Sequence, residues 1–280
     1  VVDFEVVTTK HGPVISNVML QNENPSAVFS MQWTALEPTR ELQAVIGFNK
    51  ATNWEEFEEA LLDFNAPAQN FVFADKSGTI AYKANGNVPI RKKGNAELPV
   101  PGNSSEYGWL GYIPYDELPR VVNPEVGYVA TANNEVIDEN YPYHLSNIWA
   151  QPYRYERIVE LLESKEKLTV QDMKNIQMDA KNLYAMEFLP NLLNTLKESN
   201  LANEYKEALN ILEEWDYFDT VEQSAPLIFH RLMANLQESL FINEMPEDLY
   251  KLMPGKAQIL DEMLREAYAG EIVLWIEKRD

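Results

Sequence analysis

The sequence of 280 residues contains no cysteine. This absence excludes a disulfide framework and a zinc site built on thiolates, and it fits either the cytosol or secretion from a cell that makes no disulfides. The G-x-S-x-G motif is also missing, so the sequence has no nucleophile elbow of that kind. The three histidines, His11, His144 and His230, have no recognisable triad spacing.

Positive charge and long apolar runs are scarce as well. The chain has 23 Lys and Arg against 44 Asp and Glu, a formal net charge of -21, which argues against a nucleic-acid partner because its phosphates would be repelled. No apolar run approaches the ~20 residues of a membrane span, and no signal peptide begins the sequence. Hydrophobic residues still make up 45%, which excludes a disordered chain and allows one large or two smaller domains.

What the sequence does contain is two regions with different patterns. The first region favours strands and turns, with strands expected over 2–7, 14–20, 27–36, 69–75 and 79–82, and a turn over 75–78. The first two strands flank a Gly-Pro turn and form a candidate hairpin. One helix is predicted from a capping box over 52–55 to about Phe64, and residues 85–126 are predicted to be long loops.

From Tyr153 onward the apolar residues recur at helical spacing. Helices are expected from Tyr153, from a second capping box over 169–172, and over 188–196, 203–215, 224–241 and 257–269. We therefore predict an α+β fold, with a sheet-rich part over residues 1–150 and a helical region over residues 151–280.

The most informative stretch of the sequence is Tyr128–Asn134, which we expect to be a strand that ends in the amide pair Asn133-Asn134. The stretch Trp149–Arg154 follows and precedes a long helix. A fixed Asn carboxamide can direct an N–H at a developing oxyanion, and a neighbouring Arg can hold that carboxamide in orientation. A chain that contains such an oxyanion donor but no recognisable nucleophile suggests that it is one part of an enzyme.

Several ordered segments carry a family resemblance. They are Thr8–Pro13, Trp33-Thr34, Asn53-Trp54, Ala66–Asp75, Leu98–Gly102, Trp109–Pro114, Leu118-Pro119, Asn123-Pro124 and the two stretches above. Each segment is short, but their order over residues 8 to about 190 resembles the penicillin acylase (penicillin amidase) family of N-terminal-nucleophile hydrolases. Residues 200–280 are assigned to it mainly by continuity. The resemblance implies that the first region is part of an αββα core with an antiparallel sheet.

The resemblance also implies a nucleophile outside this chain. The family's large subunit begins with a serine released by autoproteolysis, whose own α-amine is the base. Val1 has no nucleophilic side chain, and it lies in an alternating stretch without an initiator Met, so we expect an internal piece of the large subunit that is inactive alone. Its expected partners are the rest of the precursor, namely the small subunit and the N-terminal part of the large one, and a small-molecule amide.

Four site residues are expected from the resemblance. Asn133 would donate its side-chain N–H to the tetrahedral intermediate, and Arg154 would support the site; read alone, they would be a turn residue and a helix-start ion-pair partner. Trp33 and Gln69 would line the acyl pocket, although Trp33 read alone would be a core residue. Relatives that prefer an arylacetyl group have an apolar wall at the position of Gln69, so this polar residue argues against a phenylacetyl preference.

No cofactor and no metal ligand are expected in this chain. Some relatives hold a structural calcium through an aspartate just after a Tyr-Pro pair, but here His144 follows Tyr141-Pro142 at that place and supplies no carboxylate oxygen. Calcium in the intact protein therefore has no support from this sequence. Because relatives are commonly exported, we expect a secreted, extracellular protein.

The function that we expect is that of a penicillin acylase-type amidohydrolase, of which this chain is a fragment. The intact protein would cleave linear amides through an acyl-serine intermediate. Two alternatives remain: an N-acyl homoserine lactone acylase of the same fold, and a non-catalytic binding or scaffold module in which the acylase-like motifs are only structural.

Overall fold

The computed structural model describes residues 5–16, 28–200, 202–242 and 245–271. The chain divides into two compact units, one of residues 1–131 with 135–149 and one of residues 132–134 with 150–280. Strands lie in the first unit and the second is helical, so the predicted α+β class is confirmed. Parts of the strands expected over 2–7, 14–20 and 27–36 fall outside the described residues.

An antiparallel sheet organises the first unit. Its order is β3-β4-β7, with bounds β3 Gln69–Ala74, β4 Ile80–Asn85 and β7 Arg120–Val122. The strands predicted over 69–75 and from 79 are therefore confirmed, and Gln69 lies opposite Asn85. The predicted turn between them is also confirmed, because Asp75 Oδ1 accepts the backbone N–H groups of Ser77 and Thr79.

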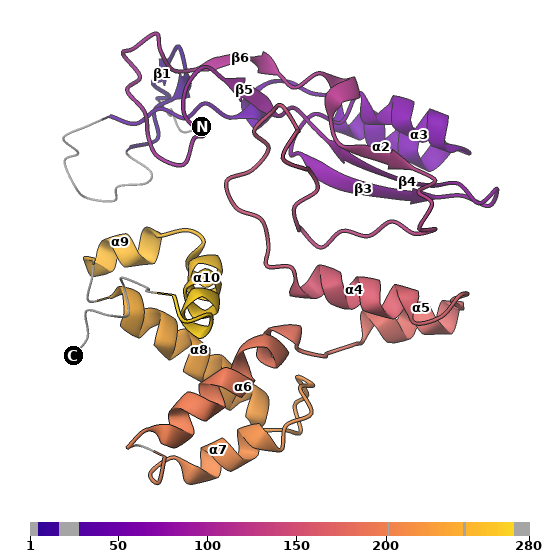
Figure 1. Cartoon of the computed structure of the whole chain (residues 1–280). Coiled ribbons are helices and arrows are strands. Elements are labelled where there is room, and N and C mark those ends of the chain that lie inside the picture. Colours follow the sequence, from indigo (N-terminus) through magenta and orange to yellow (C-terminus); the bar gives the residue numbers. More distant parts are fainter. Residues whose placement is uncertain (1–4, 17–27, 201, 243–244, 272–280) are drawn as a thin grey trace. The chain divides into compact units, whose positions relative to one another are not determined.

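Two helices, α2 (Glu41–Lys50) and α3 (Trp54–Leu61), lie side by side on one face of this sheet (Figure 1). Trp54, Leu61 and Ala81 are buried between helices and sheet. Helix α2 was not predicted, because its apolar residues do not form one inward stripe: Leu42 and Ile46 are exposed. Helix α3 was predicted, but it ends at Leu61, before Phe64.

The capping of α3 corrects the predicted capping box by one residue. Asn53, not Thr52, is the N-cap, and its Oδ1 accepts the Glu56 N–H at 2.9 Å. The Glu56 carboxylate in turn accepts the backbone N–H of Thr52 at 2.7 Å. Asn53 thus satisfies one free N–H group of the first turn, and the backbone N–H of Thr52, just before the cap, is paired with Glu56.

The remaining strands of the first unit are short. A hairpin forms in this region, but its strands β1 (Thr8–Thr9) and β2 (Gly12–Pro13) lie within the predicted connection and not over 2–7 and 14–20, so that Lys10 and His11 make the turn. Strand β5 (Pro89–Arg91) pairs with β6 (Trp109–Tyr112). The prediction of a strand over 27–36 was wrong in its described part, where Ser30 makes a single bridge and Thr34–Leu36 forms the 3-10 helix η1. Residues 85–126 also include η2 (Tyr115–Glu117), so they are not only loops.

The second unit is built from helices. They are α4 (Tyr153–Glu163), α5 (Val170–Gln177), α6 (Leu183–Glu198), α7 (Lys206–Glu213), α8 (Ala225–Phe241), α9 (Glu247–Leu252) and α10 (Lys256–Tyr268). The capping box of Thr169 with Asp172 is confirmed. Helix α6 begins earlier than predicted because Asn182 caps it by accepting the Ala185 N–H, and the six-residue α9 was not predicted.

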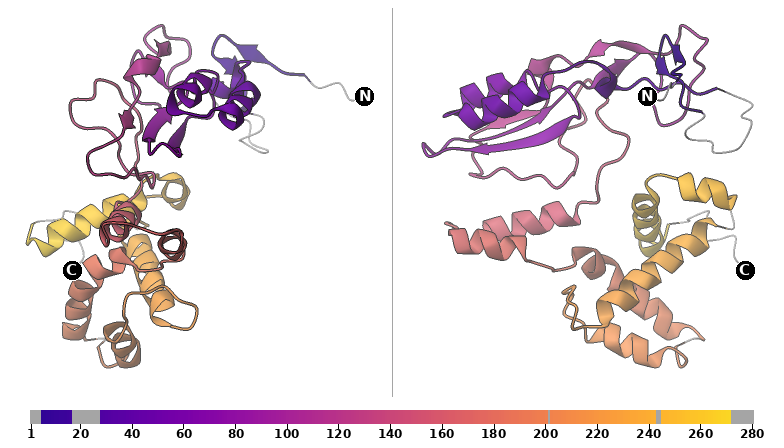
Figure 2. Two further views of the ribbon diagram at one scale, coloured as in Figure 1. Left: turned by 90° about the vertical axis from the view of Figure 1, so that its right-hand side faces the viewer. Right: turned by 180° about the vertical axis from the view of Figure 1, so that it is seen from behind.

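The core of the second unit lies where α6, α8 and α10 pack together. Phe188, Leu189, Phe229, Phe241 and Leu260 have at most 1% of their surface exposed. Figure 2 shows this bundle from two further directions. Among the described helices, none is both long and apolar enough to cross a lipid bilayer.

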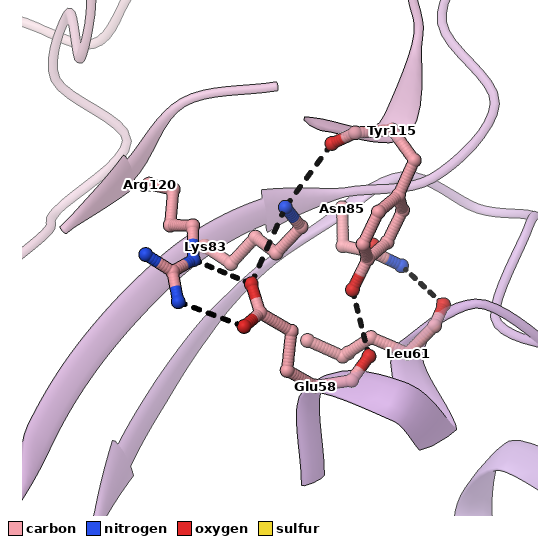
Figure 3. Close-up of polar contacts among 6 residues, drawn as sticks. All are labelled: Glu58, Leu61, Lys83, Asn85, Tyr115 and Arg120. Carbon is pink, nitrogen blue, oxygen red and sulfur yellow. Dashed lines mark hydrogen bonds and ion pairs between the residues drawn. The ribbon is translucent and has the colours of Figure 1, made fainter. Parts of the chain in front are cut away.

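A buried lysine ties α3 to the sheet of the first unit (Figure 3). Lys83 on β4 is fully buried, and its Nζ donates to the Tyr115 carbonyl at 3.1 Å and lies 3.7 Å from Glu58 Oε1. Glu58 also accepts two hydrogen bonds from Arg120, at 2.5 and 2.8 Å. These bonds, first of all that from Arg120, lower the pKa of Glu58, whereas burial lowers the pKa of Lys83.

We predict that Glu58→Gln in the intact protein lowers the free energy of unfolding by about 3 kcal/mol, because Lys83 then keeps a buried charge without a counter-ion. Since the folded-state pKa of Glu58 is lowered, its contribution is present above the ordinary pKa of glutamate and is lost as the pH falls through the folded-state value. The stability difference from wild type should therefore shrink in acid. Thermal unfolding against pH measures it, with the exposed Glu59→Gln as control; equal effects of the two variants would refute it.

Candidate functional site

The amide pair Asn133-Asn134 does not end a strand, which corrects the prediction for Tyr128–Asn134. Residues 128–131 make no ladder, and Asn133 has a left-handed backbone with φ +64°. Asparagine tolerates this conformation better than most residues because its short polar side chain bonds locally. The backbone carbonyl of Asn133 accepts the Ala150 N–H at 2.9 Å, so the segment 132–134 is joined to the start of the helical unit.

Arg154, in the first turn of α4, holds this segment. Its Nη2 donates to the Ala132 carbonyl at 2.7 Å and to Asn133 Oδ1 at 3.0 Å. The carboxamide oxygen of Asn133 is thus occupied, and no described residue accepts a hydrogen bond from its Nδ2. The side chain is exposed, so the Nδ2–H groups are accessible to a ligand.

The neighbouring Asn134 differs in its role. Its Oδ1 accepts the backbone N–H of Ala132 at 3.0 Å, which closes a local turn. The two adjacent amides therefore have different roles, which the sequence alone could not assign. Asn134 fixes the loop conformation, and the carboxamide oxygen of Asn133 is already hydrogen-bonded to Arg154.

Trp33 lies at a cavity of about 240 Å³ inside the first unit. The side chain is 52% exposed, so it is not the core residue of the alternative interpretation. The same cavity is lined by Ala68, Arg91 and Trp109, which the sequence analysis did not select. Arg91 and Trp109 come from the paired strands β5 and β6, and Ala68 comes from the segment just before β3.

Gln69 is exposed at the start of β3 and is not among the residues that line this cavity, although Ala68 before it is. Gly86 allows Ala68 to lie close to it. Its φ is +135°, and a Cβ there would lie only 2.6 Å from Ala68 Cα. The roles of Trp33 and Gln69 as pocket residues therefore remain predictions. The catalytic roles of Asn133 and Arg154 remain predictions as well.

A larger cavity, of about 670 Å³, lies in the second unit, and Arg154 is one of its lining residues. Its other charges are paired within the fold. Arg157 donates Nε and Nη2 to the two oxygens of Asp179 at 2.8 Å, which lowers the pKa of that carboxyl group. His230 Nε2 lies 3.0 Å from Asp219 Oδ2, a pair that the sequence did not suggest because the two lie on different elements.

Within the described residues, no three His, Asp or Glu side chains are grouped so that they could hold a metal ion. The sequence-based expectation about calcium concerned the intact protein, and it stays a prediction.

Comparison with known proteins identifies the family. A family model described as penicillin amidase matches residues 1–279. The chain belongs to this family. The resemblance seen over residues 8 to about 190 is thereby confirmed, and the assignment of residues 200–280 by continuity is confirmed with it.

Individual members of the penicillin amidase family are similar over much of the chain. Penicillin acylase 2 proenzyme of Pseudomonas sp. (strain SE83) is 33% identical over 63% of this chain and 22% of its own length. Acyl-homoserine lactone acylase QuiP of Pseudomonas fluorescens is 31% identical over 82% of this chain and 27% of its own length. The chain therefore spans about a quarter of the length of these curated relatives.

A solved structure supports the fold. Thermostable penicillin G acylase from Alcaligenes faecalis matches with a TM-score of 0.67 and 23% identity, over 90% of this chain and 45% of that one. At this identity the match shows the fold alone, and it agrees with the predicted α+β class.

We predict that Gly86→Ala perturbs the cavity beside Trp33, because the new Cβ would overlap Ala68. Gly78→Ala is the matched control: Gly78 also has a positive φ, +100°, but no atom lies within 4 Å of the place that its Cβ would take. Both variants bear the cost of the backbone conformation, and only Gly86→Ala adds overpacking of about 1–3 kcal/mol. Thermal unfolding of the intact protein should show a clearly larger loss for Gly86→Ala; equal losses would contradict the steric role.

Proposed function

We propose that this chain supplies the oxyanion-stabilising donor of an amidohydrolase whose nucleophilic serine lies elsewhere in a longer protein. The observation that carries the proposal is the hydrogen bond from Arg154 Nη2 to Asn133 Oδ1. It fixes which end of the carboxamide is the oxygen and leaves the N–H groups as donors. An amide with a free rotamer and an ambiguous orientation would not be prepared for this task.

The chemistry follows from that orientation. When a serine oxygen attacks an amide carbonyl, negative charge collects on the former carbonyl oxygen. An N–H that already points to this position stabilises the charge without reorganisation, and one such donor typically contributes about 2.7–4 kcal/mol to the transition state. Arg154 adds a second effect: its positive charge draws electron density toward Oδ1 and strengthens the opposite N–H as a donor.

Trp33 and Gln69 complete the proposal as acyl-pocket residues. Trp33 supports it by its exposure at a cavity that is lined in part by apolar side chains, such as Trp109 and Leu145, and in part by polar ones, which suits one part of an amide substrate. The polar Gln69 argues against a plain phenylacetyl group. The chain alone is proposed to be inactive, because the acyl-serine intermediate requires the rest of the precursor.

A second candidate is hydrolysis of N-acyl homoserine lactones. It is favoured by relatives named as acyl-homoserine lactone acylases, which are 31% and 29% identical over 82% and 92% of this chain. Both reactions break an amide bond and use the same oxyanion donor. Initial rates of the intact protein on penicillin G and on N-acyl homoserine lactones of increasing chain length would separate the two.

We predict that Asn133→Ala in the intact protein lowers kcat by about 10²–10³-fold with little change in KM, because the donor acts only in the transition state. Asn133→Asp is the sharper variant: its carboxylate still accepts from Arg154, but it offers no N–H. Steady-state kinetics with circular dichroism as a folding control tests both. Near-normal kcat in either variant would favour the alternative of a non-catalytic scaffold module.

We predict that Arg154→Met lowers kcat less than Asn133→Ala, since it releases the carboxamide without removing it. If Arg154 acts through Asn133, the double variant should be no slower than Asn133→Ala alone. A double-mutant cycle on kcat/KM measures this coupling. Fully additive effects would show that Arg154 acts independently, as an ordinary helix-start residue.

A further inference from the structure

The start of helix α4 contacts Asn133 on one side and the interior of the helical unit on the other. Ala150 donates its backbone N–H to the Asn133 carbonyl at 2.9 Å, and Arg154 Nη2 donates to Asn133 Oδ1 at 3.0 Å. Between these two residues, Gln151 and Tyr153 instead form hydrogen bonds with side chains of α10 and α6. The groups that fix Gln151 and Tyr153 therefore also fix the groups that hold Asn133.

One of these groups is the carboxyl group of Asp261 on α10, a residue that is only 2% exposed. Its Oδ2 accepts a hydrogen bond from Gln151 Nε2 at 2.5 Å and lies 3.5 Å from the Tyr153 hydroxyl. Its Oδ1 is buried and has no partner among the described residues. The Arg265 guanidinium, one turn further along α10, forms its ion pair with Glu187 instead.

A carboxyl group in this place is costly. Its neighbours on α10 include the buried apolar residues Leu260, Met263 and Leu264. Burial raises the pKa of Asp261, against the opposing effect of the hydrogen bond from Gln151. Native structures seldom keep a buried polar atom unpaired without a reason, and a leucine would fill the same volume without that cost. What a leucine could not supply is the hydrogen bond to Gln151.

We propose that Asp261 is a positioning residue, which fixes Gln151 and thereby keeps the Ala150 N–H and the Arg154 guanidinium in contact with Asn133. This inference rests on the proposed function, in which Asn133 stabilises the oxyanion. A left-handed, non-glycine backbone such as that of Asn133 persists only where several contacts hold it. A catalytic donor must also be held to within about 0.5 Å of its productive position by the residues around it.

The kinetic test measures kcat and KM of the intact protein on penicillin G, or on the N-acyl homoserine lactone that it hydrolyses. Asp261→Leu should lower kcat by about tenfold and leave KM within about twofold, because a displaced donor weakens transition-state binding alone. Asp261→Asn keeps an acceptor oxygen for Gln151 and should stay close to wild type. Gln151→Met removes the donor of the same hydrogen bond and should reproduce the loss of Asp261→Leu.

A merely structural role gives a different result. If Asp261→Leu only reduced the folded fraction, kcat would fall by the same factor in an Asn133→Ala background. Positioning through Asn133 predicts no further loss in that background. Glu262→Leu, at the next and exposed position of α10, is the matched control and should leave kcat unchanged.

Two results overturn the proposal: an equal loss in both backgrounds, and a normal kcat in folded Asp261→Leu. If Asp261→Leu does not fold, Gln151→Met carries the same tests, because Gln151 is only half-buried and lies outside the apolar core.

Hydrogen–deuterium exchange separates this inference from the proposed function. Loss of the hydrogen bond should accelerate amide exchange of the peptide that contains Ala150 in Asp261→Leu and Gln151→Met by about tenfold, and not in Glu262→Leu. If Asn133→Ala keeps a normal kcat but exchange is faster in Asp261→Leu, the oxyanion proposal fails and the hold of Asp261 on the start of α4 stands. Unchanged exchange in folded Asp261→Leu and Gln151→Met refutes that hold whatever the activity.

Discussion

The candidate site depends on the contact of one guanidinium with one loop. Arg154 Nη2 donates both to the Ala132 carbonyl and to Asn133 Oδ1, at 2.7 and 3.0 Å. Together with the hydrogen bond from Ala150 to the Asn133 carbonyl, this contact makes residues 132–134 part of the helical unit, although the chain on either side belongs to the other unit. The conformation of Asn133, with φ +64°, is retained because these bonds hold it from both ends.

Hydrogen bonds between charged side chains and their acceptors also stabilise parts of the interior. Two cations that the fold removes from water are paired: Lys83 with Glu58 and the Tyr115 carbonyl, and Arg157 with Asp179. The buried Asp261 has no such ion pair: its Oδ2 accepts a hydrogen bond from Gln151, and its Oδ1 has no partner among the described residues.

Predictions from local patterns were most accurate where local contacts decide the outcome. The hairpin of β3 and β4 and the capping box at Thr169 follow from neighbouring residues, and both were predicted. Helix α2 and the strands β5 and β6 were missed, because α2 lacks a clear apolar stripe and the short strands are specified by pairing across a bulge. The strand expected before Asn133 was wrong for a related reason: its alternating residues have no partner strand among the described residues.

The sequence by itself determined the family, the α+β class and the two candidate residues Asn133 and Arg154, because ordered motifs and local propensities are properties of the chain alone. Only the tertiary structure decided which of two adjacent amides is held by Arg154. The physical reason is that hydrogen-bond pairing and desolvation depend on groups that are distant in sequence. Trp33 and Trp109, for example, are far apart along the chain and line one cavity only in the folded unit.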